Sequence, residues 1–451
     1  MKFPDKNKCT IAIIGIGYVG LPLAIEFAKD KVNLRNKKIN IHKVIGFDIN
    51  KKRIQELNKG IDVTKETTKK DLKEAKFLEF TDESSNLVGA DVWIISVPTP
   101  IDAKKQPNLL PLETASELMG KVIKEKAKQY QNKKNHTMPI IIFESTVFPG
   151  ATEEICVPII EKFSNLKFNI DFVCGYSPER INPGDNELKL TSIKKVTSGS
   201  TPESSKWIDD LYGSIIEAGT HLANSIKVAE TAKIIENTQR DINIALMNEL
   251  AIICNYINVD TLDVLKAAST KWNFLNFKPG LVGGHCIGVD PYYLTWKSKE
   301  LGYTPEVVLA GRRINDHMPE WIAEKLIDEL TSKSIEIKNS RILILGITFK
   351  ENCPDLRNSK VIEMVKKFKN HSANCTVVDP LANSSDLKNL IEVEFYNKLE
   401  KFKPFDGVIA AVKHKYFQKL KIKDWENLIK DNGTLVDLKG IIPRSLNPKR
   451  I

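Results

Sequence analysis

The sequence predicts an α/β protein with two Rossmann-like, doubly wound domains joined by a central helical dimerisation region. Residues 9–14 form a short apolar, β-branched run that ends in GIGYVG, and helical periodicity follows over 21–29; this is the order strand, glycine turn, helix. Residues 225–257 contain neither Pro nor Gly and keep helical spacing, so we expect one long helix there. The last third repeats the alternation of strand and helix without the glycine pattern, with strands expected at 341–345, 375–379, 407–412 and 434–437.

The length of the chain allows two or three domains. It has 451 residues and 42% hydrophobic content, enough for several buried cores. We expect a cofactor-binding domain over 1–205, a central helical domain with a cysteine loop over 206–315, and a second α/β domain over 316–451. The apolar surface of the central helices favours a homodimer.

Composition excludes several classes of protein. The net charge of +10 comes from scattered basic residues without interleaved aromatics, so nucleic-acid binding is not supported. Seven widely spaced cysteines without a C-x-x-C pair argue against a disulfide framework and against a metal site. No run of 18 apolar residues or signal peptide is visible, so we expect a cytoplasmic protein without a membrane span.

The first glycine turn has the spacing of a dinucleotide-binding fingerprint, in which a pyrophosphate rests on a helix N-terminus. The next expected strand, 43–48, ends in Asp48, whose carboxylate suits ribose hydroxyls and repels a 2′-phosphate, so NAD is favoured over NADP. Asp48 follows Gly20 by 28 residues because a polar insert, 31–42, separates them. Arg53, one helical turn further, either reaches the same nucleotide or is a solvated charge.

Three more expected strands end in polar turns. Residues 91–97 run into PTP, residues 139–143 into ESTVFPG, and residues 172–175 into YSPERINPG, which carries an acid and a base. Ordinary turn chemistry explains any one of these loops. In a doubly wound sheet, however, ligands bind at the carboxyl ends of the strands, and these ends share one edge with the first glycine turn.

The loop 280–294, GLVGGHCIGVDPYYL, is the strongest candidate for covalent chemistry. It presents Cys286 and, four residues later, Asp290. Glycines at 280, 283 and 284 allow positive φ and a close approach of a ligand, which suits a nucleophilic thiol. The carboxylate can assist proton transfer. The alternative is a small buried hydrophobe in a tight turn.

Two pairs of polar residues have a functional and a neutral interpretation. Lys233 and Asn237 are four apart and share a helix face, which presents an ammonium and an amide either to a ligand or to solvent. Lys350 and Arg357 follow the first strand of the last third, where they either hold phosphates or are solvated loop charges. Between these two pairs, a shorter helix is expected at 262–268.

Taken together, the motifs resemble the UDP-glucose/GDP-mannose dehydrogenase family over nearly the whole chain. They are GIGYVG, VPTP, ESTVFPG, SPER, the helix with Lys233 and Asn237, GGHCIGVDPYYL and FKENCPDLRNS, in this order. The last two look most like the branch that acts on UDP-N-acetylhexosamines for capsules and O antigens. The resemblance implies two NAD-dependent oxidations at C6 of UDP-GlcNAc or UDP-GalNAc, through a thiohemiacetal and a thioester on Cys286. It also implies a UDP-sugar site in the last domain.

The resemblance assigns a role to each matching residue. Cys286 is the nucleophile, Lys233 stabilises the developing oxyanion beside Asn237, and Asp290, Thr146 and the loop acid Glu179 handle protons and water. Substrate positions match Glu179, Arg180, Lys233, Asn237, Lys271, Gly283 and Lys350. Cofactor positions match Gly15, Gly17, Tyr18, Val19, Gly20, Asp48, Arg53, Thr99, Thr146 and Arg357.

Two departures from the family pattern favour an N-acetylated sugar over UDP-glucose. Pro183 stands where UDP-glucose enzymes have a second acid, and an arginine expected upstream of the glycine loop is missing, with Lys271 as the nearest substitute. The main rival is a UDP-N-acetylmannosamine or UDP-glucose dehydrogenase, because one epimer changes only a few hydrogen bonds. A non-catalytic nucleotide-sugar sensor would have little need of Cys286, Lys233 and Asp290 together.

Overall fold

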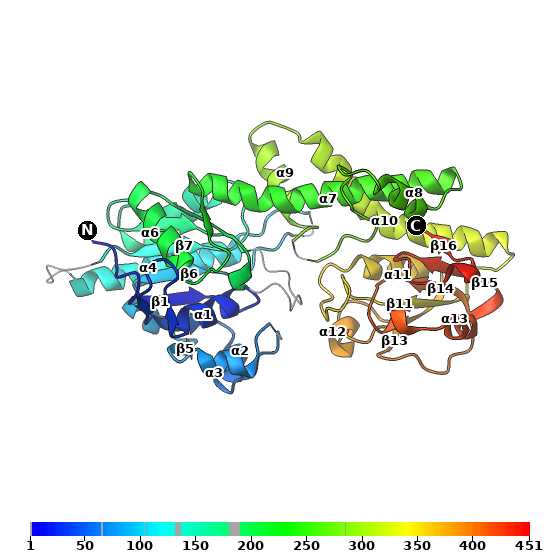
Figure 1. Cartoon of the computed structure of the whole chain (residues 1–451), viewed down its shortest axis with the longest axis horizontal. Helices are drawn as coiled ribbons and strands as arrows, with labels where there is room; N and C mark the ends of the chain where they lie inside the picture. The colour runs from blue at the N-terminus through cyan, green and yellow to red at the C-terminus, as the bar shows by residue number, and fades with distance from the viewer. Residues whose placement is uncertain (1, 65, 103, 131–136, 180–189, 285) are drawn as a thin grey trace. The chain divides into compact units, whose positions relative to one another are not determined.

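The computed structural model describes residues 2–64, 66–102, 104–130, 137–179, 190–284 and 286–451. The chain divides into two compact units, Met1–Ile235 and Glu236–Ile451. Each unit is built on a largely parallel sheet with helices packed on it, so the expected α/β class is confirmed (Figure 1). The boundaries expected near residues 205 and 315 stay predictions, and the first sheet itself continues beyond residue 205 to Leu222.

The described part of the first unit forms one sheet of eight strands in the order β10-β9-β8-β7-β6-β1-β4-β5. The strands are β1 Thr10–Ile14, β4 Lys43–Phe47, β5 Leu78–Thr81, β6 Val92–Ile95, β7 Ile140–Phe143, β8 Val173–Tyr176, β9 Lys195–Gly199 and β10 Thr220–Leu222. Its helices are α1 Gly20–Ala28, α2 Lys51–Asn58, α3 Lys69–Glu74, α4 Leu110–Tyr130, α5 Val157–Ser164 and α6 Pro202–Gly213. The core between the sheet, α1 and α6 includes Ile11, Ile13, Leu23, Phe27 and Trp207.

Sequence reasoning found the central strands of this sheet but not β5, β9 and β10. β9 pairs antiparallel with β8, unlike the other neighbours in the sheet. An antiparallel neighbour needs no crossover helix, so the alternation of strand and helix that marks a doubly wound domain is broken there. β9 also begins with Lys195, a charge that is buried.

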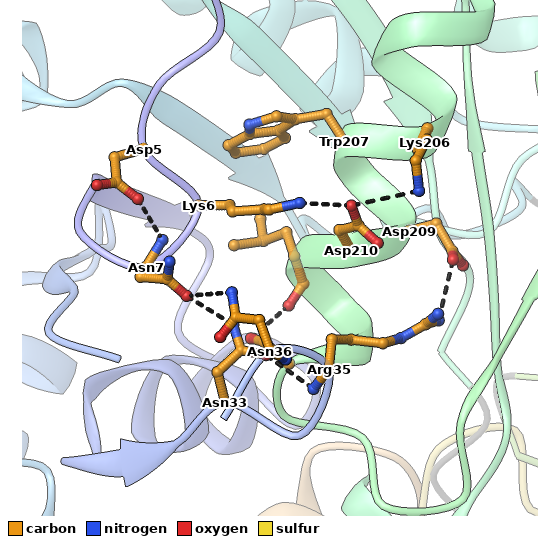
Figure 2. Close-up of polar contacts among 12 residues, drawn as sticks. Asp5, Lys6, Asn7, Asn33, Arg35, Asn36, Lys206, Trp207, Asp209 and Asp210 are labelled. Carbon is orange, nitrogen blue, oxygen red and sulfur yellow. Dashed lines mark hydrogen bonds and ion pairs between the residues drawn. The ribbon is translucent and has the colours of Figure 1, made fainter. Parts of the chain in front are cut away.

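The polar insert 31–42 is a small hairpin of β2 (Lys31–Val32) and β3 (Ile39–Asn40). Figure 2 shows how its turn is tied to the N-terminal segment and to α6. The Asn33 amide donates to Asn7, and Arg35 forms an ion pair with Asp209 at 2.9 Å. The insert is therefore held against the N-terminal segment and α6 within the first unit.

The long helix predicted over 225–257 is α7, Ile226–Tyr256, and it spans the boundary between the two units. In the second unit it is followed by α8 Thr261–Ala268, which confirms the shorter predicted helix, and then by α9 Asp290–Glu300 and α10 Glu306–Ser332. The described part of this unit has a six-stranded parallel sheet in the order β13-β12-β11-β14-β15-β16. Its elements are β11 Arg341–Leu345, α11 Lys360–Asn370, β12 Asn374–Val378, α12 Ser384–Lys388, β13 Glu394–Tyr396, β14 Phe405–Ala410, α13 Ile422–Leu428, β15 Ile429–Asp437 and β16 Lys449–Arg450.

Candidate active site

Each of the three glycines in the first turn is required, or left open, for a different geometric reason. Gly15 has φ +92°, and a Cβ there would lie 2.8 Å from the Ser96 carbonyl oxygen. A Cβ on Gly20 would lie 2.0 Å from the Gly15 carbonyl oxygen, whereas a Cβ on Gly17 would meet no atom within 4 Å. Two glycines thus permit the tight turn and the packing of α1, and the third leaves the backbone open to a ligand. This is the division of roles found in dinucleotide-binding turns, so these residues fit NAD.

Asp48 and Arg53 both contact the backbone of this turn. Asp48 follows β4, and its Oδ2 accepts a hydrogen bond from the Ile16 backbone N–H at 3.0 Å. The Arg53 side chain is 7% exposed, donates from Nε to the Ile16 carbonyl at 3.0 Å, and pairs with Asp62 at 2.9 Å. The interpretation of Arg53 as a solvated charge is therefore wrong, because the guanidinium braces the glycine turn. Tyr18 and Val19, in the same turn, are half-buried.

The loops after β6, β7 and β8 lie together at the carboxyl edge of the sheet. Ser145 donates from Oγ to the Val97 carbonyl at 2.7 Å, linking the ESTVFPG and PTP turns. Thr99 and Thr146 lie half-buried in these turns. Glu179, in the loop after β8, is buried and accepts a hydrogen bond from Lys195 at 2.8 Å. The arrangement confirms that the expected loops share one edge. Arg180 and Pro183 lie outside the described residues.

The first turns of α7 are joined to the ESTVFPG loop by Glu230. Its carboxylate accepts hydrogen bonds from the Gly150 N–H at 2.5 Å, the Thr152 N–H at 3.0 Å and the Thr152 hydroxyl at 2.6 Å. Burial raises the pKa of Glu230 to about 7, although these hydrogen bonds act to lower it. Lys233 lies three residues further along α7 and is buried, so its interpretation as a solvent-facing charge is wrong.

In the second unit, the cysteine loop packs against the loop that follows β11. A Cβ on Gly283 would lie 2.7 Å from the Asn358 carbonyl oxygen, and a Cβ on Gly284, whose φ is +81°, would lie 2.8 Å from the Phe349 ring. The Gly284 N–H donates to the Arg357 carbonyl at 3.2 Å, and the Asn358 amide donates to the Gly284 carbonyl at 3.0 Å. These glycines therefore serve loop packing, and their expected role in ligand approach stays a prediction.

Cys286 differs from the other six cysteines in exposure. It is half-exposed, whereas the others are buried, so the interpretation of Cys286 as a buried hydrophobe does not fit. Its carbonyl accepts hydrogen bonds from the N–H groups of Val289 and Asp290 at 3.0 and 2.8 Å, which leads the loop into α9. The buried Asp290 carboxylate accepts from the Asn237 amide of α7 at 2.6 Å. Asn237 is thus also buried rather than solvent-facing.

Asn248 anchors the start of the cysteine loop, and sequence reasoning missed it. Its side chain exchanges two hydrogen bonds with the Gly280 backbone, at 2.8 and 3.0 Å, and contacts Asn315 of α10 at 2.8 Å. Asn315 in turn contacts Asp241, which pairs with Arg312 at 2.6 Å. A polar residue on the buried face of a long helix was the available signal, since buried amides need partners.

A basic pocket lies beside the cysteine loop within the second unit. Its lining includes Leu281 of that loop and three lysines, Lys350, Lys360 and Lys439. Lys360 pairs with Asp316 at 3.0 Å and with Glu363, whereas the described residues supply no carboxylate within ion-pair distance of the Lys439 ammonium. Burial lowers the pKa of Lys439, and Lys413 acts in the same direction while Glu351 opposes it. Such a pocket suits phosphate groups.

Three further basic residues differ in how far the sequence predicted their surroundings. Lys439 was missed, although it follows β15 in a Leu-Lys-Gly turn at a strand's carboxyl end, the same signal used for the other loops. The Arg357 guanidinium is half-exposed and forms a bidentate pair with Asp355. Lys271 is exposed.

The chain matches known proteins along almost its entire length. Residues 9–216, 227–317 and 343–444 match the NAD binding, central and UDP binding domains of one family. A UDP-N-acetyl-D-glucosamine 6-dehydrogenase of Salmonella typhi is 50% identical over 445 residues, 99% of each chain. Protein CapL of Staphylococcus aureus is 52% identical over 432 residues, 96% of each chain. The structure of a UDP-D-ManNAc dehydrogenase from Pyrococcus horikoshii has a TM-score of 0.82, 28% identity and 96% coverage of each chain.

Each group of candidate site residues falls in one of the three matched domains. The glycine turn with Asp48 falls in the NAD binding domain, Lys233 and Cys286 in the central domain, and Lys350 and Lys439 in the UDP binding domain. None of the helices in the described residues combines the length and apolarity that a membrane crossing requires. The chain belongs to the UDP-glucose/GDP-mannose dehydrogenase family and binds NAD through its first domain.

Proposed function

We propose that the protein is an NAD-dependent UDP-N-acetylhexosamine 6-dehydrogenase that oxidises UDP-GlcNAc or UDP-GalNAc to the uronic acid for surface polysaccharides. The contact between the cysteine loop and the basic pocket carries this proposal. Gly283 and Gly284 pack on Phe349 and Asn358, so the loop with Cys286 is fixed to the loop with Lys350. A sugar nucleotide held by its phosphates at Lys350 and Lys439 would have its sugar beside the thiol.

The residues of the chain supply the chemistry around the sugar. NAD+ held by the glycine turn and Asp48 would supply the hydride acceptor for each of the two oxidations. The Cys286 sulfur adds to the C6 aldehyde and, after the second oxidation, holds the acid as a thioester, which water cleaves to the carboxylate and the free thiol. The ammonium of Lys233 would stabilise the negative oxygen, a contribution of about 3 kcal/mol for a good donor. Asp290, held by Asn237, and Thr146 and Glu179 would handle protons and water.

The identity of the sugar is the finer part of the proposal. Relatives at 50% identity named for UDP-GlcNAc favour that substrate over UDP-ManNAc, since the relatives named for UDP-ManNAc are 30% identical or less. Purified protein should be incubated with NAD+ and UDP-GlcNAc, UDP-GalNAc, UDP-ManNAc or UDP-glucose, and NADH absorbance followed. We expect two NADH per molecule of UDP-GlcNAc or UDP-GalNAc. A preference for UDP-ManNAc or UDP-glucose would replace the proposed substrate, and no NADH with any sugar would refute the activity.

We also propose a cytoplasmic homodimer. Large apolar side chains are exposed in the central region, among them Leu246, Ile253, Tyr256 and Trp272, which is 96% exposed. Apolar groups at this density suit an interface between copies of the chain. The proposal extends to Arg357 and Arg53 as contacts of the bound nucleotides and to Lys271 as a sugar contact.

A further inference from the structure

A buried charge cluster lies at the carboxyl edge of the first sheet. Lys195, the first residue of β9, is 3% exposed, and its ammonium donates to Glu144 at 3.1 Å and to Glu179 at 2.8 Å. Glu144 follows β7 and directly precedes Ser145 and Thr146, while Glu179 lies in the loop after β8. One ammonium therefore bridges the loops of two neighbouring strands.

The fourth member of the cluster is Tyr212 of α6. Its hydroxyl donates to the second oxygen of Glu144 at 2.5 Å, and the Lys195 ammonium lies 5.3 Å from the centre of its ring. Burial raises the pKa of Glu144, with Lys195 opposing this rise and Glu179 adding to it. Burial alone would lower the pKa of Lys195, but Glu144 and Glu179 together raise it. The ammonium is thus retained because it is shared by two carboxylates.

We propose that Lys195 is a positioning residue that holds the Glu179 carboxylate in a fixed orientation at the site edge by tying it to Glu144. The inference rests on the proposed function, in which Glu179 handles the water that cleaves the thioester. Among the described residues, Lys195 of β9 contacts Glu179 directly, and Glu144 of β7 and Tyr212 of α6 are close enough to influence its charge. Lys195 is the cation among them, and it donates directly to Glu179.

The test compares the pH dependence of turnover in four variants. Lys195→Met should leave the KM values for NAD+ and UDP-sugar within about twofold and lower kcat by roughly 10- to 100-fold. The acid limb, which is the fall of kcat toward low pH, should move to higher pH by about 1 pH unit or more. Glu144→Gln removes the competing carboxylate and should move the same limb downward. Lys195→Arg should restore most of the rate. Tyr212→Phe, which disturbs Glu144 without contacting Glu179 directly, should leave the limb unmoved.

A second measurement does not depend on turnover. Lys195→Met should lower the Tm by roughly 5 °C or more at pH 8 and by less at pH 5, since two buried carboxylates lose their cation. Glu144→Gln in the Lys195→Met background should reduce this pH dependence. If the parent is active and the acid limb of Lys195→Met is the same as that of the parent, the inference is overturned. It is also overturned if the Tm of Lys195→Met depends on pH in the same way as the Tm of the parent. An inactive parent with the expected Tm pattern would refute the proposed function but leave the cluster's charge arrangement supported.

Discussion

At the scale of single residues, Cys286 is set apart from the other cysteines by exposure and by its position before α9. A serine hydroxyl is far less ionised than a thiol, so Cys286→Ser should form and release an acyl intermediate much more slowly. We expect near-normal binding of NAD+ and UDP-sugar and a loss of steady-state uronic acid production of ~10³-fold or more. Intact-protein mass spectrometry and the NADH trace together measure both effects. Turnover near the parent rate would exclude Cys286 as the nucleophile.

Lys350 and Lys439 line the pocket beside the cysteine loop, and each would give a charge-assisted hydrogen bond to a phosphate. Lys350→Ala and Lys439→Ala should therefore each weaken binding of UDP by ~10-fold or more, with NAD+ binding unchanged. Isothermal titration with UDP measures this without turnover. Lys415→Ala removes an exposed lysine of the same unit and serves as the control. Equal UDP affinity in all three variants would show that the phosphates bind elsewhere.

Glu230 gives a prediction about pH and stability. Its pKa is raised from 4.5 to about 7 by burial. The folded state therefore favours the protonated carboxyl, and the contribution to stability is full below pH 4.5 and lost as the pH rises through about 7. The loss corresponds to about 3 kcal/mol.

Replacing Glu230 with glutamine removes this titration. The Tm of the parent relative to Glu230→Gln should fall as the pH rises from 5 to 8, in scanning calorimetry at fixed ionic strength. Glu154→Gln is the matched control, since Glu154 lies two residues from Thr152, a partner of Glu230, but its side chain is 40% exposed. A difference in Tm that is constant or grows with pH would mean that the hydrogen bonds from Gly150 and Thr152 outweigh the burial.

At the scale of elements, the position of the cysteine loop depends on helix α7. Asn248→Ala would remove both hydrogen bonds to the Gly280 backbone and leave buried groups unpaired, at a cost of about 1–3 kcal/mol of unfolding free energy. A shift of the loop should lower kcat/KM by ~10- to 100-fold, with NAD+ binding unchanged. Asn243→Ala is the control, because Asn243 is half-buried on the same helix and its amide donates to the Gln239 carbonyl of that helix rather than to the cysteine loop. Equal kinetics in the two variants would contradict the anchoring role.

The elements also show where sequence reasoning succeeds and where it stops. The apolar runs of β1, β7 and β11 predicted their strands because both faces of a parallel sheet are buried. The motif loops were likewise found, since polar turns at strand ends are visible in sequence. Lys195 was missed because a lysine at the start of a strand is usually solvated, and its burial depends on Glu144 and Glu179, which lie 51 and 16 residues away.

At the scale of the whole molecule, the candidate site residues are divided between the two units. The first holds the glycine turn, Asp48 and the loops with Thr146 and Glu179, and the second holds Cys286 and the basic pocket. Lys233 and Asn237 lie on α7 on either side of the boundary, at Ile235 and Glu236. A helix that carries site residues into both units explains why a stretch of this length contains neither Gly nor Pro, since either would weaken its continuity.

The exposed apolar side chains of the second unit lead to the last prediction, a homodimer. Leu246 and Ile253 are seven residues apart on α7, so they share one face, and Tyr256 follows on the last turn of that helix. Light scattering after size exclusion should give twice the chain mass of 50.9 kDa. Ile253→Glu places a charge on this face and should shift the protein toward the monomer, because burying an unpaired carboxylate is costly. Ile170→Glu, at an exposed isoleucine of the first unit, should remain dimeric. A fully active monomeric parent would refute the dimer, whereas a dimeric Ile253→Glu would move the interface to another surface.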